Sequence, residues 1–236
     1  MYAFLKFVMR LVTRTYLVGG LFTVEGTENV PRTGPLLVCP NHVSTIDPPM
    51  VPAFLPRPDS WSMGKAEYFT RTFTRLIFTR YHAFPVVRHT ADRKAVRRAR
   101  AILESGHVLV VYPEGTRIRE GGLKQAEPGA GFLAQVTGAP VLPVGLIGTR
   151  DCFPTGAWWP RRRRVRVVFG RPFWLPARRL DGSRVTHQDA SDAIMLAVAE
   201  MLPVEYRGVY SDLEALRARL GPLYAREASP APTKGR

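Results

Sequence analysis

Short apolar runs alternate with amphipathic stretches along most of this chain. Apolar runs bounded by Gly, Pro and polar residues predict buried strands at 36–39, 107–112, 141–147 and 165–169. Apolar residues spaced three and four apart predict helices between them, at about 47–55, 67–80, 91–105, 129–137 and 188–202. This alternation of strands and helices is typical of an α/β sheet domain.

The first 24 residues predict a basic amphipathic helix. Lys6, Arg10 and Arg14 are spaced four apart and therefore share one side of a helix. The apolar residues that fall largely on another side are Phe4, Leu5, Val8, Leu11 and Val12. The pattern favours a helix that lies in a membrane interface with its cations toward the lipid, although a helix packed on the protein's own core with an exposed basic edge has the same pattern. No long apolar region or A-x-A site follows, so we expect no cleavable signal peptide.

The one uncharged stretch long enough to span a membrane runs over 128–149. It contains so many Gly and Pro residues that it predicts a short helix, a turn at 137–140 and a buried strand. We therefore expect no transmembrane span. Residues 25–226 are expected to form a single domain, and the Ala-, Ser- and Pro-rich segment 227–236 is expected to be a disordered tail.

The charge of the chain narrows the classes of partner. The 236 residues contain 34 Lys and Arg against 19 Asp and Glu, which gives a formal net charge of +15. Such a surplus predicts an anionic partner, and nucleic acid, a membrane surface and a phosphorylated substrate all fit. The only two cysteines, Cys39 and Cys152, exclude a disulfide framework and a cysteine-rich zinc site.

The segment from Asn41 to Pro49 carries the sharpest candidate chemistry. It lies between a predicted strand and a predicted helix that begins at Asp47, with Pro48 suited to the first helical position. On a regular helix, side chains five apart point about 140° apart. His42 and Asp47 therefore meet only if the segment between them is not helical. If they meet, they form a general base with its orienter; if not, they are a loop histidine and a helix cap, and two further metal ligands with suitable spacing are not evident.

A second polar segment, Pro113-Glu114-Gly115-Thr116-Arg117, directly follows the predicted strand 107–112. In open α/β sheets, ligands bind at the carboxyl ends of the strands. Gly115 allows a close approach of the backbone, and Thr116 and Arg117 supply donors for an anion. The same residues also suit a simple turn. The segments 64–67, with Lys65, and 84–88, with Arg88, fit the same logic more weakly.

Taken in order along the chain, these pieces resemble the phospholipid/glycerol acyltransferase family, which includes the bacterial 1-acylglycerol-3-phosphate acyltransferases. His42 and Asp47 match the family's H-x-x-x-x-D motif, and Phe84 to Arg88 match its aromatic-x-x-x-Arg element. The P-E-G-T-R element is present in full at 113–117. An apolar segment around Pro143 matches the fourth block, and 64–67 resembles the family's lysine-containing segment. The resemblance covers about residues 25–170.

The resemblance implies a single-domain α/β fold with a mixed, largely parallel sheet flanked by helices. It implies that His42 is the general base, with Asp47 as its orienter, for direct attack of an acceptor hydroxyl on an acyl thioester. The absence of a G-x-S-x-G motif agrees with direct attack. The residues that it implies for the acceptor's glycerol phosphate are Arg88, Glu114, Gly115, Thr116 and Arg117, with Lys65 as a second phosphate contact. It implies that Pro143 shapes the wall for the acyl chain or donor, and that no metal or other cofactor takes part.

The function expected from the resemblance is acylation of lysophosphatidic acid to phosphatidic acid, with acyl-CoA or acyl carrier protein as donor. Glycerol 3-phosphate, another lysophospholipid or a lyso-aminolipid is the alternative acceptor. We expect peripheral attachment to an anionic membrane surface on the cytoplasmic side of the cell membrane. A non-enzymatic nucleic-acid or membrane-binding module is a remote alternative, supported by the run Arg161 to Arg164. No nucleic-acid-binding signature accompanies that run, so nucleic acid is not an expected partner.

Overall fold

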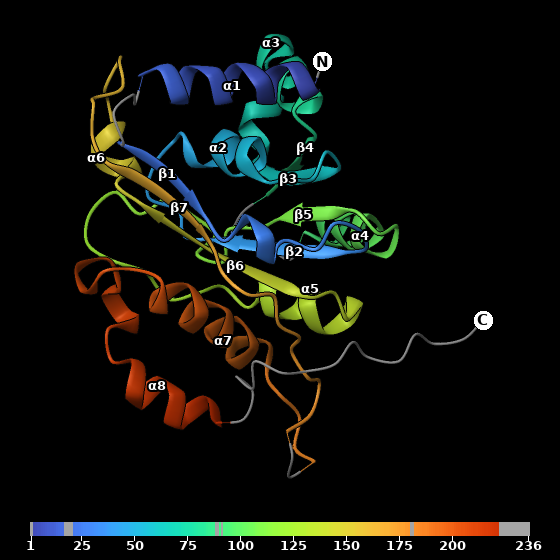
Figure 1. Ribbon diagram of the computed structural model, residues 1–236. Helices are drawn as coiled ribbons and strands as arrows, with labels where there is room; N and C mark the ends of the chain where they lie inside the picture. Colours follow the sequence, from blue (N-terminus) through green and yellow to red (C-terminus); the bar gives the residue numbers. More distant parts are fainter. Residues whose placement is uncertain (1, 17–20, 88–89, 91, 180–181, 222–236) are drawn as a thin grey trace.

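The computed structural model describes residues 2–16, 21–87, 90, 92–179 and 182–221 (Figure 1). The predicted tail at 227–236 and Arg88 lie outside the described residues. The strands are β1 (Phe22–Glu25), β2 (Leu36–Pro40), β3 (Ser60–Lys65), β4 (Ala83–Val86), β5 (Val108–Val110), β6 (Val141–Ile147) and β7 (Val165–Phe169). The α-helices are α1 (Tyr2–Tyr16), α2 (Asp47–Phe54), α3 (Thr72–Arg80), α4 (Arg93–Glu104), α5 (Gly129–Thr137), α6 (Thr149–Cys152), α7 (His187–Glu200) and α8 (Leu213–Leu220).

The seven strands form one sheet in the order β1-β7-β6-β2-β5-β3-β4. The five strands from β6 to β4 are parallel, whereas β7 runs antiparallel to β6 and pairs in parallel with β1. The predicted α/β class with a mixed, largely parallel sheet is thereby confirmed. Because β2, β5, β3 and β4 all run the same way, the loops that follow them meet at one edge of the sheet.

Both faces of the central strands are buried, which explains why these strands are apolar along their whole length. Leu37 and Leu109 point to the face covered by α4, α5 and α7, and their neighbours Val38 and Val110 point to the face covered by α2. Figure 1 shows these two layers, with α1 lying beyond α2. In the layer formed by α4, α5 and α7, α5 approaches α7 so closely that a β-carbon at Gly131 would lie 2.3 Å from a backbone oxygen of α7.

The predicted elements are confirmed most fully where apolar residues are continuous. The strands at 141–147 and 165–169 and the helix at 129–137 have the predicted bounds, and the predicted helix at 188–202 is α7. The predicted helix at 67–80 is instead a 3-10 turn, Ala66–Phe69, followed by α3. The pattern gave no prediction of strands for β1, β3 and β4, since these are short and contain polar or half-buried positions.

The N-terminal helix forms as predicted, but the prediction that Lys6 and Arg10 face lipid is wrong. Lys6 is only 7% exposed and donates to the carbonyl oxygens of Leu55 (3.3 Å) and Arg57 (2.7 Å). Arg10 donates to the carbonyl of Ala53. Ala53 and Leu55 are at the C-terminal end of α2, where carbonyls have no partner within the helix and the helix dipole is negative, so Lys6 and Arg10 cap this end. Lys6 also reaches the carbonyl of Arg57 in the loop that follows α2. Arg14 remains exposed.

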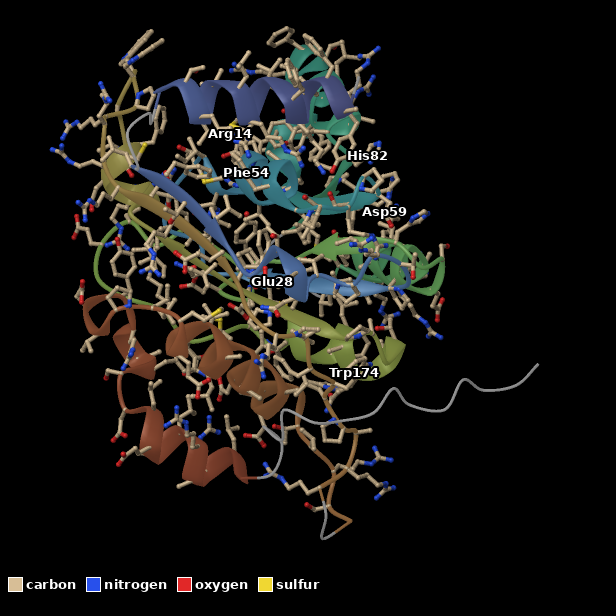
Figure 2. The ribbon with its side chains drawn as sticks, viewed as in Figure 1. Arg14, Glu28, Phe54, Asp59, His82 and Trp174 are labelled. Atoms are coloured by element: carbon tan, nitrogen blue, oxygen red, sulfur yellow. The ribbon has the colours of Figure 1, made fainter. Side chains whose placement is uncertain are left out.

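The inward turn of these cations leaves the apolar side of α1 toward solvent. The exposed apolar side chains of this helix are Phe4, Phe7, Val8, Leu11 and Val12. At its N-terminal end, Tyr2 stacks on His82 with ring centroids 4.2 Å apart, and the label in Figure 2 places His82 beside that end of the helix. No helix that the structure describes has both the length and the apolar character needed to cross a membrane.

Candidate active site

The turn from Asn41 to Asp47, called here the 41–47 turn, links the carboxyl end of β2 to the start of α2. His42 and Asp47 do meet: Nδ1 of His42 lies 3.0 Å from Oδ2 of Asp47. The same Oδ2 accepts the backbone N–H groups of Val43 (2.8 Å) and Ser44 (2.7 Å). These bonds hold 42–46 in a turn rather than a helix, which is the condition that the spacing of the two residues required. Asp47 is fully buried, and His42 is 8% exposed.

The contact with Asp47 determines which proton-accepting atom His42 offers. A carboxylate oxygen accepts, so Nδ1 of His42 carries the proton and Nε2 is left as the acceptor. The ring also packs against Tyr112, with centroids 4.3 Å apart. The imidazole is thus fixed on two sides, and its free nitrogen is suited to take a proton from a substrate.

The backbone of His42 is clamped by the P-E-G-T-R loop. Its N–H donates to Oε1 of Glu114 (2.9 Å), and its carbonyl accepts from the N–H of Ile118 (2.8 Å). The second oxygen of Glu114 accepts the N–H of Lys124 at 3.1 Å. Both Glu114 oxygens are therefore engaged with backbone groups, and this arrangement favours positioning of His42 over direct contact with a substrate.

Burial has a second effect on Glu114. The side chain is almost wholly enclosed, and this desolvation raises the pKa of Glu114 to about 7. The donated N–H groups of Lys124 and His42 oppose the rise, and the nearby negative charge of Asp47 adds to it. The clamp therefore changes its protonation state near neutral pH.

Asn41 extends the sheet into the 41–47 turn. Its Nδ2 donates to the carbonyl of Leu146 (3.0 Å), and its Oδ1 accepts the N–H of the same residue (2.7 Å). The side chain thereby imitates one more residue of the β2–β6 ladder. Asn41 thus fixes the residue before His42, and Glu114 holds the N–H of His42 itself. The sequence placed Asn41 at the start of the candidate segment 41–49 but predicted no role for it.

Tyr112 is a site residue that the sequence analysis missed. Its hydroxyl is buried and has no hydrogen-bond partner among the described residues, and Oδ1 of Asp47 is in the same condition. Burial, reinforced by the negative charge of Asp47, raises the pKa of Tyr112 well above its usual value. The signal available in the sequence is the position of Tyr112 directly before Pro113, at the end of a strand.

Gly115 and Arg117 belong to the same P-E-G-T-R loop as Glu114. Gly115 adopts a left-handed conformation with φ of 65°, and its N–H closes a turn on the carbonyl of Tyr112 (3.0 Å). A β-carbon at Gly115 would lie 3.0 Å from the Glu127 side chain. The Nε atom of Arg117 is buried without a hydrogen-bond partner among the described residues. A half-buried guanidinium with one enclosed donor to spare is suited to an anionic ligand.

Two further predicted site residues, Lys65 and Pro143, make their hydrogen bonds and ion pairs with residues other than His42 and Asp47. Lys65 is at the carboxyl end of β3 and forms an ion pair with Glu67, with 2.9 Å between Nζ and Oε1. Pro143 is in the middle of β6, opposite Cys39, and its carbonyl accepts the N–H of Gly170 at 2.9 Å. Lys65 is thus at the correct edge of the sheet, whereas Pro143 lies within the sheet. Their predicted roles stay predictions.

The described residues contain no group of three or more His, Cys, Asp or Glu side chains placed to hold a metal ion. A histidine with one nitrogen held by a buried carboxylate is suited to proton transfer.

Comparison with known proteins agrees with this geometry. Residues 21–147, more than half of the chain, match the model of the Acyltransferase family. The chain belongs to this family. The matched segment includes the 41–47 turn and the P-E-G-T-R loop, so the family resemblance inferred from the motifs is confirmed.

Curated relatives of the chain carry a more specific name. The chain is 27% identical over 156 residues to the chloroplastic 1-acyl-sn-glycerol-3-phosphate acyltransferase BAT2 of Brassica napus, covering 64% of this chain and 44% of that protein. It is 26% identical over 140 residues to the 1-acyl-sn-glycerol-3-phosphate acyltransferase of Borreliella burgdorferi, covering 58% and 56%. The matched part of the chain thus spans about half the length of these relatives.

A solved structure extends the likeness to the fold. The 1-acyl-sn-glycerophosphate (LPA) acyltransferase PlsC of Thermotoga maritima superposes with a TM-score of 0.61 and is 27% identical. The likeness covers 72% of this chain and 68% of that one. The chain therefore has the fold of a known member of its family.

Proposed function

We propose that this protein transfers a fatty acyl group from an acyl thioester, acyl-CoA or acyl carrier protein, to the free glycerol hydroxyl of lysophosphatidic acid, which gives phosphatidic acid. The observation that carries the proposal is the buried His42–Asp47 pair, with Nδ1 and Oδ2 at 3.0 Å. Family membership and the names of the relatives support the choice of acceptor. The location proposed for the reaction is the cytoplasmic side of the cell membrane, with peripheral attachment.

In the proposed reaction, Nε2 of His42 removes the proton from the acceptor hydroxyl as its oxygen attacks the thioester carbonyl. The new C–O bond forms, the C–S bond breaks, and the thiolate takes the proton back from His42. Asp47 stabilises the imidazolium that exists between these steps, because its carboxylate accepts from Nδ1. No acyl-enzyme is formed.

The carbonyl oxygen of the thioester becomes negative during attack and needs donors. In the 41–47 turn, the N–H groups of Val43 and Ser44 already donate to Asp47. The backbone N–H groups of Thr116 and Arg117 take no part in the hydrogen bonds of the described residues, so we assign the oxyanion to this loop. The Arg117 guanidinium, with Arg88 and Lys65, binds the phosphate of the acceptor.

A panel assay tests the proposal. Purified protein receives a labelled acyl thioester and, separately, lysophosphatidic acid, glycerol 3-phosphate, another lysophospholipid and a lyso-aminolipid, with products separated by thin-layer chromatography. We expect labelled phosphatidic acid from the first acceptor. Acylation of a different acceptor alone would reject the substrate assignment.

A His42→Ala variant tests the base in the same assay. Loss of general-base catalysis is expected to lower kcat by about 10²–10⁴-fold. His187→Ala is the matched control, since this exposed histidine contacts Gln135 on α5 and is expected to retain activity. A folded His42→Ala protein with undiminished kcat would remove His42 from the mechanism.

A further inference from the structure

The segment between α6 and β7 has an unusual composition for a surface loop. Residues 153–160, called here the tryptophan loop, contain Trp158 and Trp159, which are 99% and 70% exposed. Arg161 to Arg164 follow directly, and all four are exposed. Two adjacent exposed indole groups are costly in water and mark a surface that contacts an apolar or interfacial partner.

The loop is closed at its base and attached to the 41–47 turn. The N–H of Arg161 donates to the carbonyl of Cys152 at 2.5 Å, which brings its two ends together. The hydroxyl of Ser44 donates to the carbonyl of Phe153 at 3.1 Å. Ser44 is two residues from His42, so whatever holds the tryptophan loop also lies close to the proposed active site.

The tip of this loop is at the same end of the molecule as two other apolar surfaces. Figure 1 shows the segment after α6 reaching the level of α1 and α3. The outer side of α1 exposes Phe4 and Phe7, and α3 exposes Phe73, Leu76 and Ile77. These surfaces come from segments far apart in the sequence, so their location at one end is a property of the fold.

Charge decides what kind of partner these surfaces fit. α1, α3 and residues 153–164 together contain nine Lys and Arg residues and no Asp or Glu. Lys6 and Arg10 are turned inward, which leaves the arginines after the tryptophan loop as the densest exposed positive charge. Aromatic residues next to cations, without acidic residues, match the boundary between headgroups and acyl chains of an anionic bilayer.

We propose that the tryptophan loop and Arg161 to Arg164 are an interfacial anchor, which inserts Trp158 and Trp159 into an anionic bilayer and holds the 41–47 turn at the lipid surface. This inference rests on the proposed function, because it identifies the surface from which the lipid acceptor is taken. The outer sides of α1 and α3 rest on the same bilayer. The tryptophans supply apolar burial, and the arginines supply selectivity for negative lipid.

Vesicle binding tests the anchor directly. Partition coefficients are measured by flotation on phosphatidylcholine vesicles and on vesicles that also contain phosphatidylglycerol. Trp158→Ala/Trp159→Ala is expected to bind anionic vesicles at least about tenfold more weakly than the unsubstituted protein. The reason is that the variant lacks the two indole groups whose transfer from water into the bilayer favours binding. The matched control is Val204→Ala/Val209→Ala, which removes two exposed apolar side chains elsewhere and is expected to leave binding within about twofold.

The arginines are tested by their dependence on lipid charge. Replacement of Arg161 to Arg164 by Gln is expected to weaken binding to anionic vesicles by about fivefold for each cation that contacts the surface. Binding to phosphatidylcholine vesicles is expected to stay unchanged. If the replacement instead leaves vesicle binding intact and impairs only turnover with an acidic acyl carrier protein, the run binds the donor and the anchor is rejected.

Fluorescence locates the inserted residues. Brominated lipids are expected to quench the emission of the unsubstituted protein and of Trp174→Phe, but not that of Trp158→Phe/Trp159→Phe. Trp174 is a suitable control because it lies at the side of the sheet away from α1, as its label in Figure 2 shows. Equal quenching in the double variant would overturn the proposal.

The two proposals fail in different ways. Acyl transfer to a short-chain lysophosphatidic acid below its micellar concentration needs no bilayer. If the unsubstituted protein acylates this monomeric acceptor but does not bind vesicles, the anchor is wrong and the proposed function stands. If it binds vesicles but acylates no acceptor, the proposed function is wrong.

Discussion

A hydrogen bond from Ser44 to the carbonyl of Phe153 joins the 41–47 turn to the tryptophan loop, yet the two segments are built in opposite ways. In the turn, the side chains of Asn41, His42 and Asp47 are buried and held by hydrogen bonds to specific partners. In the loop, the two largest side chains are exposed to water. The contrast matches the two roles that we propose: proton transfer needs atoms fixed in advance, and contact with a fluid bilayer needs exposed surface of the correct polarity.

The largest effect that distinguishes the two regions is expected from Asp47→Asn. The amide oxygen is able to accept the same three donors, but the negative charge that stabilises the His42 imidazolium is lost. We expect kcat to fall by about 10²–10⁴-fold, measured with saturating acceptor and donor.

Asp212→Asn provides the control for Asp47→Asn. Asp212 also accepts a backbone N–H, that of Ala215 at 2.9 Å, but it lies at the start of α8, outside the site. The kcat of the Asp212→Asn variant is expected to stay within about twofold of that of the unsubstituted protein. Equal losses in both variants would show that a general structural defect, and not the charge at position 47, lowers activity.

A smaller effect, visible in its pH dependence, is expected from Glu114→Gln. The pKa of Glu114 is about 7 in the folded state and lies at its ordinary, lower value in the unfolded chain. Between these values the folded protein binds more protons, so this carboxyl's contribution to the free energy of unfolding is present below about pH 4.5 and is lost as the pH rises through 7. Denaturant titrations at several pH values measure it.

The Glu114→Gln variant has no carboxyl to titrate at this position. The free energy of unfolding of the unsubstituted protein, relative to that of the variant, is therefore expected to fall by on the order of 1–3 kcal/mol between pH 4.5 and 7. Glu120→Gln serves as the control, since this exposed carboxyl belongs to the same loop region and has no such clamp. A difference between the two proteins that does not change with pH would contradict the buried titration.

The smallest expected effect concerns the hydrogen bonds that attach α1 to the rest of the protein and so orient its apolar side toward solvent. Lys6→Met leaves the carbonyls of Leu55 and Arg57 without their donor, and we expect the free energy of unfolding to fall by about 1–3 kcal/mol. Arg14→Met, at an exposed position on the same helix, is expected to change it by less than about 0.5 kcal/mol. If Arg14→Met were the more damaging substitution, the cations-inward orientation of α1 would be refuted.

The helix at the N-terminus shows what a sequence pattern determines and what it leaves undetermined. Periodicity predicted correctly that Lys6 and Arg10 share a side of α1. It did not indicate which side faces the protein, because that depends on the carbonyls of Ala53 and Leu55 at the end of α2, which lie 43 and 49 positions further along the chain from their partners. Apolar runs specified the central strands for the opposite reason: burial on both faces leaves no choice of side.

The candidate site was predictable to a similar extent. The motif order identified His42, Asp47 and the P-E-G-T-R loop as parts of one site, and the structure brings them together. The backbone bonds of Glu114 and the packing of Tyr112 on His42 were not predictable from spacing, since both depend on how β2 and β5 are paired. Short half-buried strands such as β3 were missed because alternating polar residues give too weak a signal.

The clamp between His42 and Glu114 also bears on the order in which the protein is assembled. The two residues are 72 positions apart, and the clamp forms only when β5 takes its place beside β2. A chain still emerging from the ribosome holds His42 long before it holds the acceptor for that residue's N–H. The held position of His42 that the proposed mechanism needs therefore exists only once β5 has paired with β2 at the centre of the sheet.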